Sequence, residues 1–189
     1  PTIEVKHWAD AESFQPYSRD PETLARPWAL PGTPGLEHRI GGLGKQDITG
    51  NVSYDPDDHQ HMINTRAAKV AKIADRIPEQ DVFGPEWGDL LVVGWGSTYG
   101  AIRSAVRRAQ AKDQKVAHAH LRYLNPFPRN LGDLLLKYDK VLVPELNMGQ
   151  LSTLLDAKFP LKVISYPKVE GQPFKIAEIT TKIDEVLEN

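Results

Sequence analysis

The run Leu90-Leu-Val-Val-Gly94, followed by Trp95-Gly-Ser-Thr-Tyr-Gly100, decides the fold that we predict for this chain of 189 residues. Four consecutive apolar residues ending in glycine predict a strand buried on both faces. The next stretch places Ile102, Val106 and Ala109 on one face of a predicted helix. A strand, a glycine-bearing loop and a helix in succession form the first unit of a parallel α/β arrangement.

The alternation of short apolar runs with helical patterns continues from this unit to the last residues. We expect further strands at 115–121, 140–145 and 161–166, and helices at 131–138, 148–158 and 175–187. Strands connected by helices make right-handed crossovers within one sheet. Residues 89–189 therefore predict an α/β domain with a parallel sheet and helices on both faces.

The first part of the chain has a different character. Residues 1–58 contain turn signals such as Ala29-Leu-Pro-Gly-Thr-Pro-Gly35 and Gly41-Gly-Leu-Gly44, with no sustained periodicity. So long an irregular stretch is typical of a segment that packs on a partner, and we expect 1–58 to be an arm that packs on the domain or on a partner. Apolar residues then recur at helical spacing until Pro78, so 59–88 predicts a helix and a linker. Because the sequence begins with Pro1, we expect it to be a piece of a longer protein.

Composition excludes several classes of function. Lys and Arg number 23 against 25 Asp and Glu, a net charge of −2, so the cationic surface that nucleic acid requires is not expected. The chain has no cysteine, which excludes disulfides, thiolate zinc sites, a cysteine nucleophile and an iron–sulfur cluster held by its own side chains. No apolar run approaches the length of a membrane span and no signal peptide is visible, so we expect a cytoplasmic protein without a membrane partner.

The loop after the first buried strand is a candidate anion-binding loop, with Gly94, Gly96, Ser97 and Thr98 as its residues. Glycines there allow backbone N–H groups to approach an anion at a helix N-terminus, and Ser97 or Thr98 is expected to cap the helix. The spacing is G-x-G-x-x-x-G, not the dinucleotide-binding G-x-G-x-x-G. The alternative is a tight strand-to-helix turn with no ligand.

Two histidines on the second predicted strand, His118 and His120, point to the same face. A metal pair requires that arrangement, but buried or interface histidines have it too and are the more common case. We therefore predict no metal site.

Two further segments carry candidate functional residues. Glu37, His38 and Arg39 place ionisable groups in a glycine-flanked loop that begins at Gly35, although a solvated turn with a surface ion pair fits equally well. The other segment follows the third predicted strand, at the edge where open α/β sheets place ligands or partners. Its candidate residues are Glu145, Asn147, Gly149 and Gln150. Glu145 has the alternative role of a cap for the following helix.

Several runs together resemble a known family. They are Leu91-Val-Val-Gly-Trp-Gly-Ser-Thr-Tyr-Gly100, His120-Leu-Arg-Tyr-Leu-Asn-Pro-Phe-Pro128, Val143-Pro-Glu-Leu-Asn-Met-Gly-Gln-Leu151, Lys168-Val-Glu-Gly-Gln-Pro-Phe174, Tyr17-Ser-Arg-Asp-Pro-Glu-Thr-Leu-Ala-Arg-Pro-Trp28, Pro31-Gly-Thr-Pro-Gly-Leu-Glu-His-Arg-Ile-Gly-Gly42 and Gly50-Asn-Val-Ser-Tyr-Asp-Pro56. They are similar to the C-terminal region of the alpha subunit of 2-oxoacid:ferredoxin oxidoreductases, most of all the 2-oxoglutarate enzymes. The resemblance covers nearly the whole chain.

This resemblance implies a transketolase C-terminal-like domain within an enzyme that decarboxylates a 2-oxoacid oxidatively to acyl-CoA. The implied holoenzyme contains thiamine diphosphate, Mg²⁺, iron–sulfur clusters and coenzyme A. Its implied partners are a thiamine-binding domain upstream in the same subunit, a beta subunit and ferredoxin. This chain lacks the Gly-Asp-Gly motif that holds magnesium and diphosphate, because Leu follows both Gly88-Asp89 and Gly132-Asp133.

We therefore expect no catalytic residue and no cofactor bound by this chain alone. Its expected role is structural, with the segments 35–42 and 145–150 facing the thiamine domains or the path of substrate and coenzyme A. Two other readings stay open. One is a small nucleotide- or coenzyme A-binding domain that uses Gly94–Gly100, and the other is a stand-alone interaction module whose arm holds a partner.

Overall fold

The computed structural model describes residues 7–8 and 10–189. The chain divides into two compact units, Pro1–Arg76 and Ile77–Asn189. The finer predicted division into 1–58, 59–88 and 89–189 stays a prediction. Among the described residues, no helix is long and apolar enough to span a bilayer.

The second unit is built on a four-stranded sheet in the order β4-β3-β5-β6, in which every neighbouring pair is parallel. Its elements in chain order are β3 (Gly88–Trp95), α2 (Tyr99–Gln110), β4 (Val116–Leu121), α3 (Leu131–Leu135), β5 (Tyr138–Glu145), α4 (Gln150–Lys158), β6 (Ile164–Pro167) and α5 (Ile176–Glu188). The register aligns Leu91 with Ala117 on one side and with Val141 on the other. This architecture confirms the predicted α/β class with a parallel sheet.

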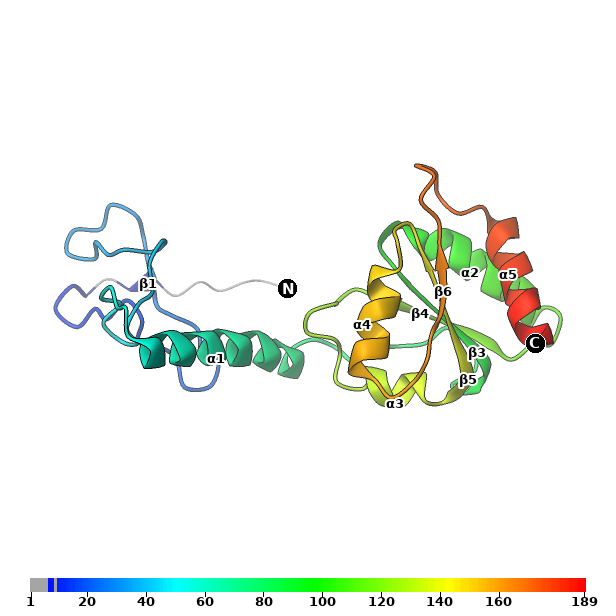
Figure 1. The fold of residues 1–189 in the computed structure, drawn as a ribbon, viewed down its shortest axis with the longest axis horizontal. Coiled ribbons are helices and arrows are strands. Elements are labelled where there is room, and N and C mark those ends of the chain that lie inside the picture. Colours follow the sequence, from blue (N-terminus) through cyan, green and yellow to red (C-terminus); the bar gives the residue numbers. More distant parts are fainter. Residues whose placement is uncertain (1–6, 9) are drawn as a thin grey trace. The chain divides into compact units, whose positions relative to one another are not determined.

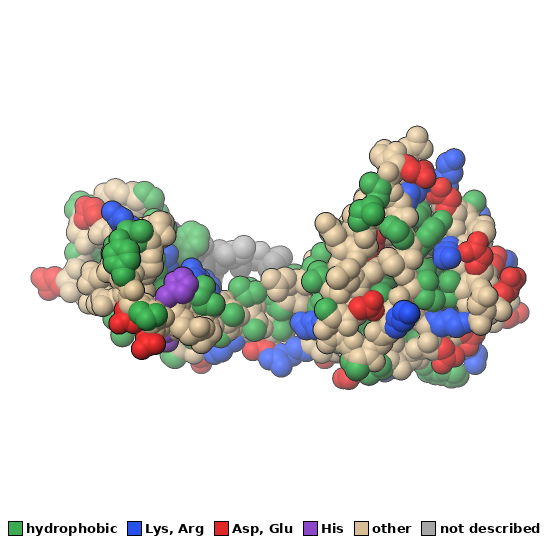
Figure 2. All heavy atoms as spheres, viewed as in Figure 1, with side chains coloured by type: hydrophobic (Ala, Val, Ile, Leu, Met, Phe, Trp, Pro, Cys, Tyr) green, Lys and Arg blue, Asp and Glu red, His purple; other side chains and the backbone are tan. Residues whose placement is uncertain are grey.

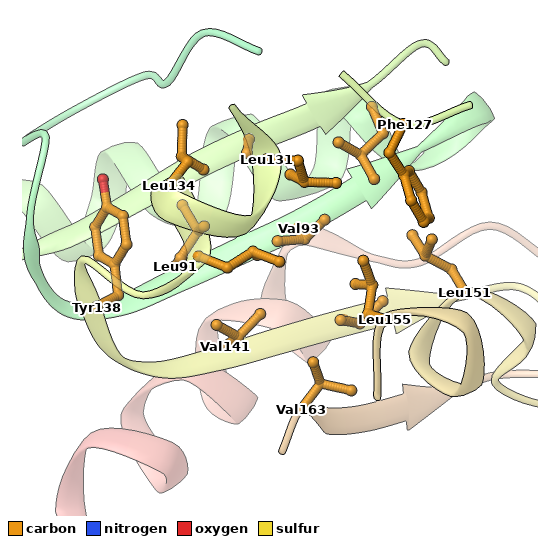
Figure 3. Close-up of a cluster of buried hydrophobic side chains, with 14 of the residues drawn as sticks. Leu91, Val93, Phe127, Leu131, Leu134, Tyr138, Val141, Leu151, Leu155 and Val163 are labelled. Carbon is orange, nitrogen blue, oxygen red and sulfur yellow. The ribbon is translucent and has the colours of Figure 1, made fainter. Parts of the chain in front are cut away.

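Helices cover both faces of the sheet, with α3 and α4 on one side and α2 and α5 on the other (Figure 1). On the first side, Leu91 and Val93 of β3 meet Leu131 of α3 and Leu151 of α4 (Figure 3). On the second side, the alternate residues of β3 pack against α2 and α5. The run 90–93 is therefore buried from both directions, as its continuous apolar character predicts.

Two elements differ most from their sequence patterns. The strand expected at 161–166 begins at Ile164, because the backbone N–H of Val163 donates to the side chain of Asp156 at 2.8 Å and not to a neighbouring strand. The helix expected at 131–138 ends at Leu135. The next strand begins only three residues later at Tyr138, whose hydroxyl donates to the carbonyl of Pro85 at 2.6 Å.

The described part of the first unit, 7–8 and 10–76, consists mainly of turns around one α-helix. Its elements are β1 (His7–Trp8), β2 (Trp28–Ala29), α1 (Pro56–Lys72) and a 3-10 turn at Ile73–Asp75. The side chain of Asp55 accepts a hydrogen bond from the N–H of Asp57 at 2.8 Å and caps α1, while Pro56 suits its first turn.

The two units differ in how many apolar side chains they bury. The buried apolar side chains described in the first unit are Tyr17, Leu36 and Met62, whereas the second unit has two continuous clusters. Figure 2 shows hydrophobic side chains on the visible surface of the first unit. Its exposed large apolar residues are Trp8, Trp28, Leu30, Ile40, Leu43, Ile48, Val52, Tyr54, Ile63 and Ile73. Among its described residues, the first unit thus leaves most of the large apolar side chains in contact with water.

Candidate functional site

The loop after β3 forms a tight strand-to-helix turn at the C-terminal edge of the sheet. Gly96 adopts a positive φ of 59°, and Ser97 is exposed. The hydroxyl of Thr98 donates to the carbonyl of Trp95 at 2.9 Å and accepts from the Trp95 N–H at 3.3 Å. No side-chain hydrogen bond caps α2 from Thr98. The predicted capping role of Ser97 or Thr98 is therefore corrected, because the Thr98 hydroxyl is used within the preceding turn.

Gly94 has a packing role that the spacing of glycines alone does not reveal. A Cβ placed on Gly94 would clash with Cδ1 of Ile102 and lie 2.9 Å from Oγ1 of Thr98. The absence of a side chain therefore lets β3 and α2 approach each other closely.

His118 and His120 lie on β4 beneath the start of α2. Their ring centroids are 5.6 Å apart, and the Tyr99 ring lies 5.6 Å from His118 and 5.0 Å from His120. His118 is 2% exposed, and neither of its ring nitrogens has a hydrogen-bond partner. His120 is half-buried, and its Nδ1 is also without a partner.

Burial determines the protonation of these two rings. It is the main cause that lowers the pKa of His118 to about 3, with smaller contributions from His120 and Arg103. Burial also lowers the pKa of His120, partly offset by a hydrogen bond with the Gly96 backbone, while Arg122 lowers it further. Both rings are therefore expected to be neutral at pH 7.

These rings line a pocket of about 190 Å³ together with residues that no sequence pattern had indicated as functional. Its lining comprises Asp81, Val82, Phe83, Tyr99, Arg103, His118, His120 and Arg122. The guanidinium of Arg103 lies over the Phe83 ring, 3.2 Å from its centroid. Tyr99 and Arg103 are four residues apart on α2, so their shared helix face was the signal that could have found them.

The segment after β5 is organised around a buried carboxylate. Glu145 is fully buried; its Oε2 accepts from the N–H of Leu151 at 2.8 Å, and its Oε1 accepts from the N–H and hydroxyl of Ser152, each at 2.9 Å. The side chain of Asn147 accepts from the N–H groups of Gly149 at 2.8 Å and Gln150 at 2.9 Å. The structure thus gives Glu145 the alternative role of a helix cap, and its carboxylate does not face solvent.

The loop from Gly35 lies in the first unit. Glu37 and Arg39 are exposed, and the Nδ1 of His38 hydrogen-bonds with the carbonyl oxygen of Leu36 at 2.8 Å. No ion pair joins Glu37 to His38 among the described contacts. A Cβ on Gly35 would lie 2.7 Å from that of Ala11, so the loop packs closely on the segment before it.

A cationic pocket of about 410 Å³ adjoins the end of this loop. The residues that line it are Tyr17, Arg19, Arg26, Ile40, Gly41, Gly42, Leu43, Gly44, Lys45, His59, Met62, Arg66 and Lys69. No carboxylate belongs to that lining. Desolvation is the main cause that lowers the pKa of Arg19, and the nearby charges of Arg26 and Arg66 lower it further, against a rise caused by Asp47.

The described residues do not fit the magnesium and diphosphate of thiamine diphosphate. Gly88 packs against the Lys115 backbone within the sheet, where a Cβ would lie 2.5 Å from the Lys115 carbonyl oxygen. Within 7–8 and 10–189, no three His, Cys, Asp or Glu side chains gather in a way that could hold a metal ion. A cysteine-ligated cluster has no ligands in this sequence.

Comparison with known proteins places this arrangement in a family. Residues 88–179 match the family described as pyruvate:ferredoxin oxidoreductase core domain II. The 2-oxoglutarate oxidoreductase subunit KorA of Mycobacterium tuberculosis is 51% identical over 180 residues, which cover 95% of this chain and 27% of that protein. The chain belongs to the alpha-subunit family of 2-oxoacid:ferredoxin oxidoreductases.

The chain is also similar to other members of this alpha-subunit family. The alpha subunit of 2-oxoacid:ferredoxin oxidoreductase 1 from Aeropyrum pernix is 29% identical, over 93% of this chain and 28% of its own length. A solved structure of 2-oxoglutarate:ferredoxin oxidoreductase from Magnetococcus marinus, with 2-oxoglutarate, coenzyme A and succinyl-CoA bound, matches 99% of this chain with a TM-score of 0.88 and 31% identity. This chain covers 33% of that one. It therefore spans about a quarter to a third of these relatives and corresponds to one region of a 2-oxoglutarate:ferredoxin oxidoreductase alpha subunit.

Proposed function

We propose that this chain is a structural and assembly region of a thiamine-diphosphate-dependent 2-oxoglutarate:ferredoxin oxidoreductase, and that it is not catalytic alone. The complete enzyme decarboxylates the 2-oxoacid oxidatively to acyl-CoA and passes electrons through iron–sulfur clusters to ferredoxin. Thiamine diphosphate and Mg²⁺ bind to domains outside this chain, in the same subunit and in the beta subunit. The proposed setting is the cytoplasm.

The observation that carries this proposal is the unequal burial of the two units. The first unit buries few large apolar side chains and exposes Trp28 at 63% and Ile40 at 69%. Exposed apolar area is stabilised when a partner covers it, at roughly 25 cal/mol for each Å² removed from water. An arm of this kind gains stability by packing on another domain, which supports an assembly role.

The two candidate segments have separate parts in this proposal. Residues Gly35–Gly42 end beside the cationic pocket, whose lining includes Arg26, Arg66 and Lys69. That charge suits a path for an anionic 2-oxoacid or for the phosphates of coenzyme A. In the segment 145–150, Glu145 fixes the start of α4, while Met148 is 81% exposed and free to contact the thiamine domain.

An activity measurement tests the inert character of the chain. The chain is mixed with thiamine diphosphate, Mg²⁺, 2-oxoglutarate, coenzyme A and oxidised ferredoxin, and ferredoxin reduction is recorded. We expect no turnover, and no tight binding of thiamine diphosphate by calorimetry. Turnover, or tight cofactor binding by the chain alone, overturns the proposal.

A second experiment tests assembly directly. The chain is co-expressed with the remainder of the alpha subunit and the beta subunit, and the recovered complex is quantified. Ile40→Ser in the arm is expected to reduce recovery at unchanged thermal stability of the chain. Leu136→Ser, at a residue of the second unit that is 58% exposed, is the matched control. Equal recovery of all three forms would argue against a packing role for the arm.

A further inference from the structure

The pocket between β4 and the first turns of α2 has no role in the assembly proposal. Three segments form its walls. The stretch Asp81–Phe83 closes one side, Tyr99 and Arg103 of α2 close another, and β4 with the residue after it contributes His118, His120 and Arg122. All of these residues belong to the second unit.

Unmet hydrogen-bonding capacity is concentrated in this pocket. Both ring nitrogens of His118, the Nδ1 of His120 and the Nε of Arg103 are buried without a partner. Buried polar atoms nearly always have a partner, because an unpaired one costs about 1–3 kcal/mol. His118 is 98% buried within the pocket wall, so solvent at the surface does not supply that partner. The side chains that carry these atoms all line the pocket, where an entering group can supply a partner.

The charges around the pocket favour an anion over a cation. The guanidinium of Arg103 is held over the Phe83 ring, which fixes its position, and Arg122 adds a second positive charge. Asp81 is the acidic residue of the lining; it is exposed, and its carboxylate accepts from the side chain of Gln80 at 3.3 Å. Two guanidinium groups next to two imidazoles repel a metal ion and attract an oxyanion.

We propose that this pocket binds the oxyanion group of a small metabolite, a phosphate or a carboxylate, between Arg103, Arg122, His118 and His120. The neutral His118 imidazole supplies one N–H donor, the single N–H of the neutral His120 ring is engaged by the Gly96 backbone, and the two guanidinium groups supply charge-assisted donors. A second, more open hollow of about 700 Å³ shares Tyr99, His120 and Arg122 with the pocket. Its further lining by Trp95, Gly96, Leu121 and Leu124 gives the body of the ligand an aromatic and apolar surface.

Nuclear magnetic resonance of the chain tests this proposal. Inorganic phosphate and malonate are titrated separately at constant ionic strength, with the Cε1–H signals of His118 and His120 and the Nε signal of Arg103 as readouts. We expect saturable shifts with at least one of the two anions. The phosphate and malonate arms identify whether the pocket takes a phosphate or a carboxylate.

Matched variants assign the binding to the pocket. Arg103→Gln is expected to weaken it about tenfold, as the loss of one charge-assisted hydrogen bond predicts. Arg108→Gln removes the same charge from an exposed position of α2 outside the pocket lining and is expected to leave the affinity unchanged. If Arg103→Gln does not fold, Arg122→Gln replaces it, because Arg122 is exposed and its loss keeps the contact between Arg103 and Phe83. Absence of saturable shifts with both anions, or equal affinity in the pocket variant and in Arg108→Gln, overturns the proposal.

Discussion

Acidification from pH 8 to pH 5 is expected to destabilise the second unit through His118. This residue is 2% exposed, and burial holds its pKa at about 3 in the folded chain. In the unfolded chain the ring has an ordinary pKa near 6.5. Between these two values the unfolded state binds a proton that the folded state does not. The free energy of unfolding therefore falls as the pH falls below about 6.5, and it continues to fall until about pH 3.

The magnitude follows from the difference in proton binding. At pH 5 nearly all unfolded molecules carry a proton on this ring, while folded molecules carry almost none. Integrating that difference from pH 8 to pH 5 gives a loss of about 2 kcal/mol from His118 alone. The lowered pKa of His120 acts in the same direction. Carboxylates contribute little in this range, because their unfolded pKa values lie near 4.

Urea unfolding at pH 8 and pH 5 measures this loss, with the amide signals of β3 as the probe for the second unit. His118→Gln keeps a polar side chain but removes the titrating group. Between pH 8 and pH 5, the free energy of unfolding of this variant should therefore fall by about 2 kcal/mol less than that of the unmodified chain. Equal pH dependence in both proteins, or protonation of the folded His118 ring above pH 5 in an NMR titration, would refute the reasoning.

Three other predictions concern single contacts. Glu145→Ala leaves the N–H groups of Leu151 and Ser152 without their acceptor, so urea unfolding should show a free energy of unfolding lower by about 3 kcal/mol. Glu145→Gln keeps one acceptor oxygen and should lower it by less than half of that amount. Gly94→Ala forces a Cβ against Ile102 and should lower the free energy of unfolding by about 1–3 kcal/mol. Gly100→Ala has open space around it on α2 and should raise that free energy by up to about 1 kcal/mol. The two variants should therefore shift the melting temperature in opposite directions, and shifts of the same sign would contradict the close approach at Gly94. Tyr138→Phe removes the hydrogen bond to Pro85 and should cost about 1 kcal/mol, so unchanged stability by the same urea measurement would show that this bond contributes nothing.

Continuous apolar runs made the sheet predictable from sequence. The run 90–93 is buried on both faces, and a strand of that kind is recognised by an apolar run that no polar residue interrupts. The limits of the strands depended on single side chains that a periodicity does not reveal. Asp156 takes the N–H of Val163, and this one hydrogen bond moves the start of β6 to Ile164.

The candidate site was less predictable, because its residues come from three separate segments. The shared face of His118 and His120 was visible in the sequence, but Arg103 meets them only after α2 packs over β4. The Thr98 cap was predicted wrongly, since a hydroxyl at such a turn can bond to the backbone before it or after it. For Glu145 the two sequence alternatives were equal, and only its complete burial decides between them.

The antiparallel bridge between Phe83 and His118 also limits β-strand pairing between separate molecules. β4 is an outermost strand, and the bridge uses outward-facing main-chain groups of His118 through two hydrogen bonds of 2.9 Å. At the opposite edge, β6 has only four residues and ends at Pro167, which has no N–H to donate. Neither border of the sheet thus offers a long free ladder, which disfavours edge-to-edge pairing between copies of this domain.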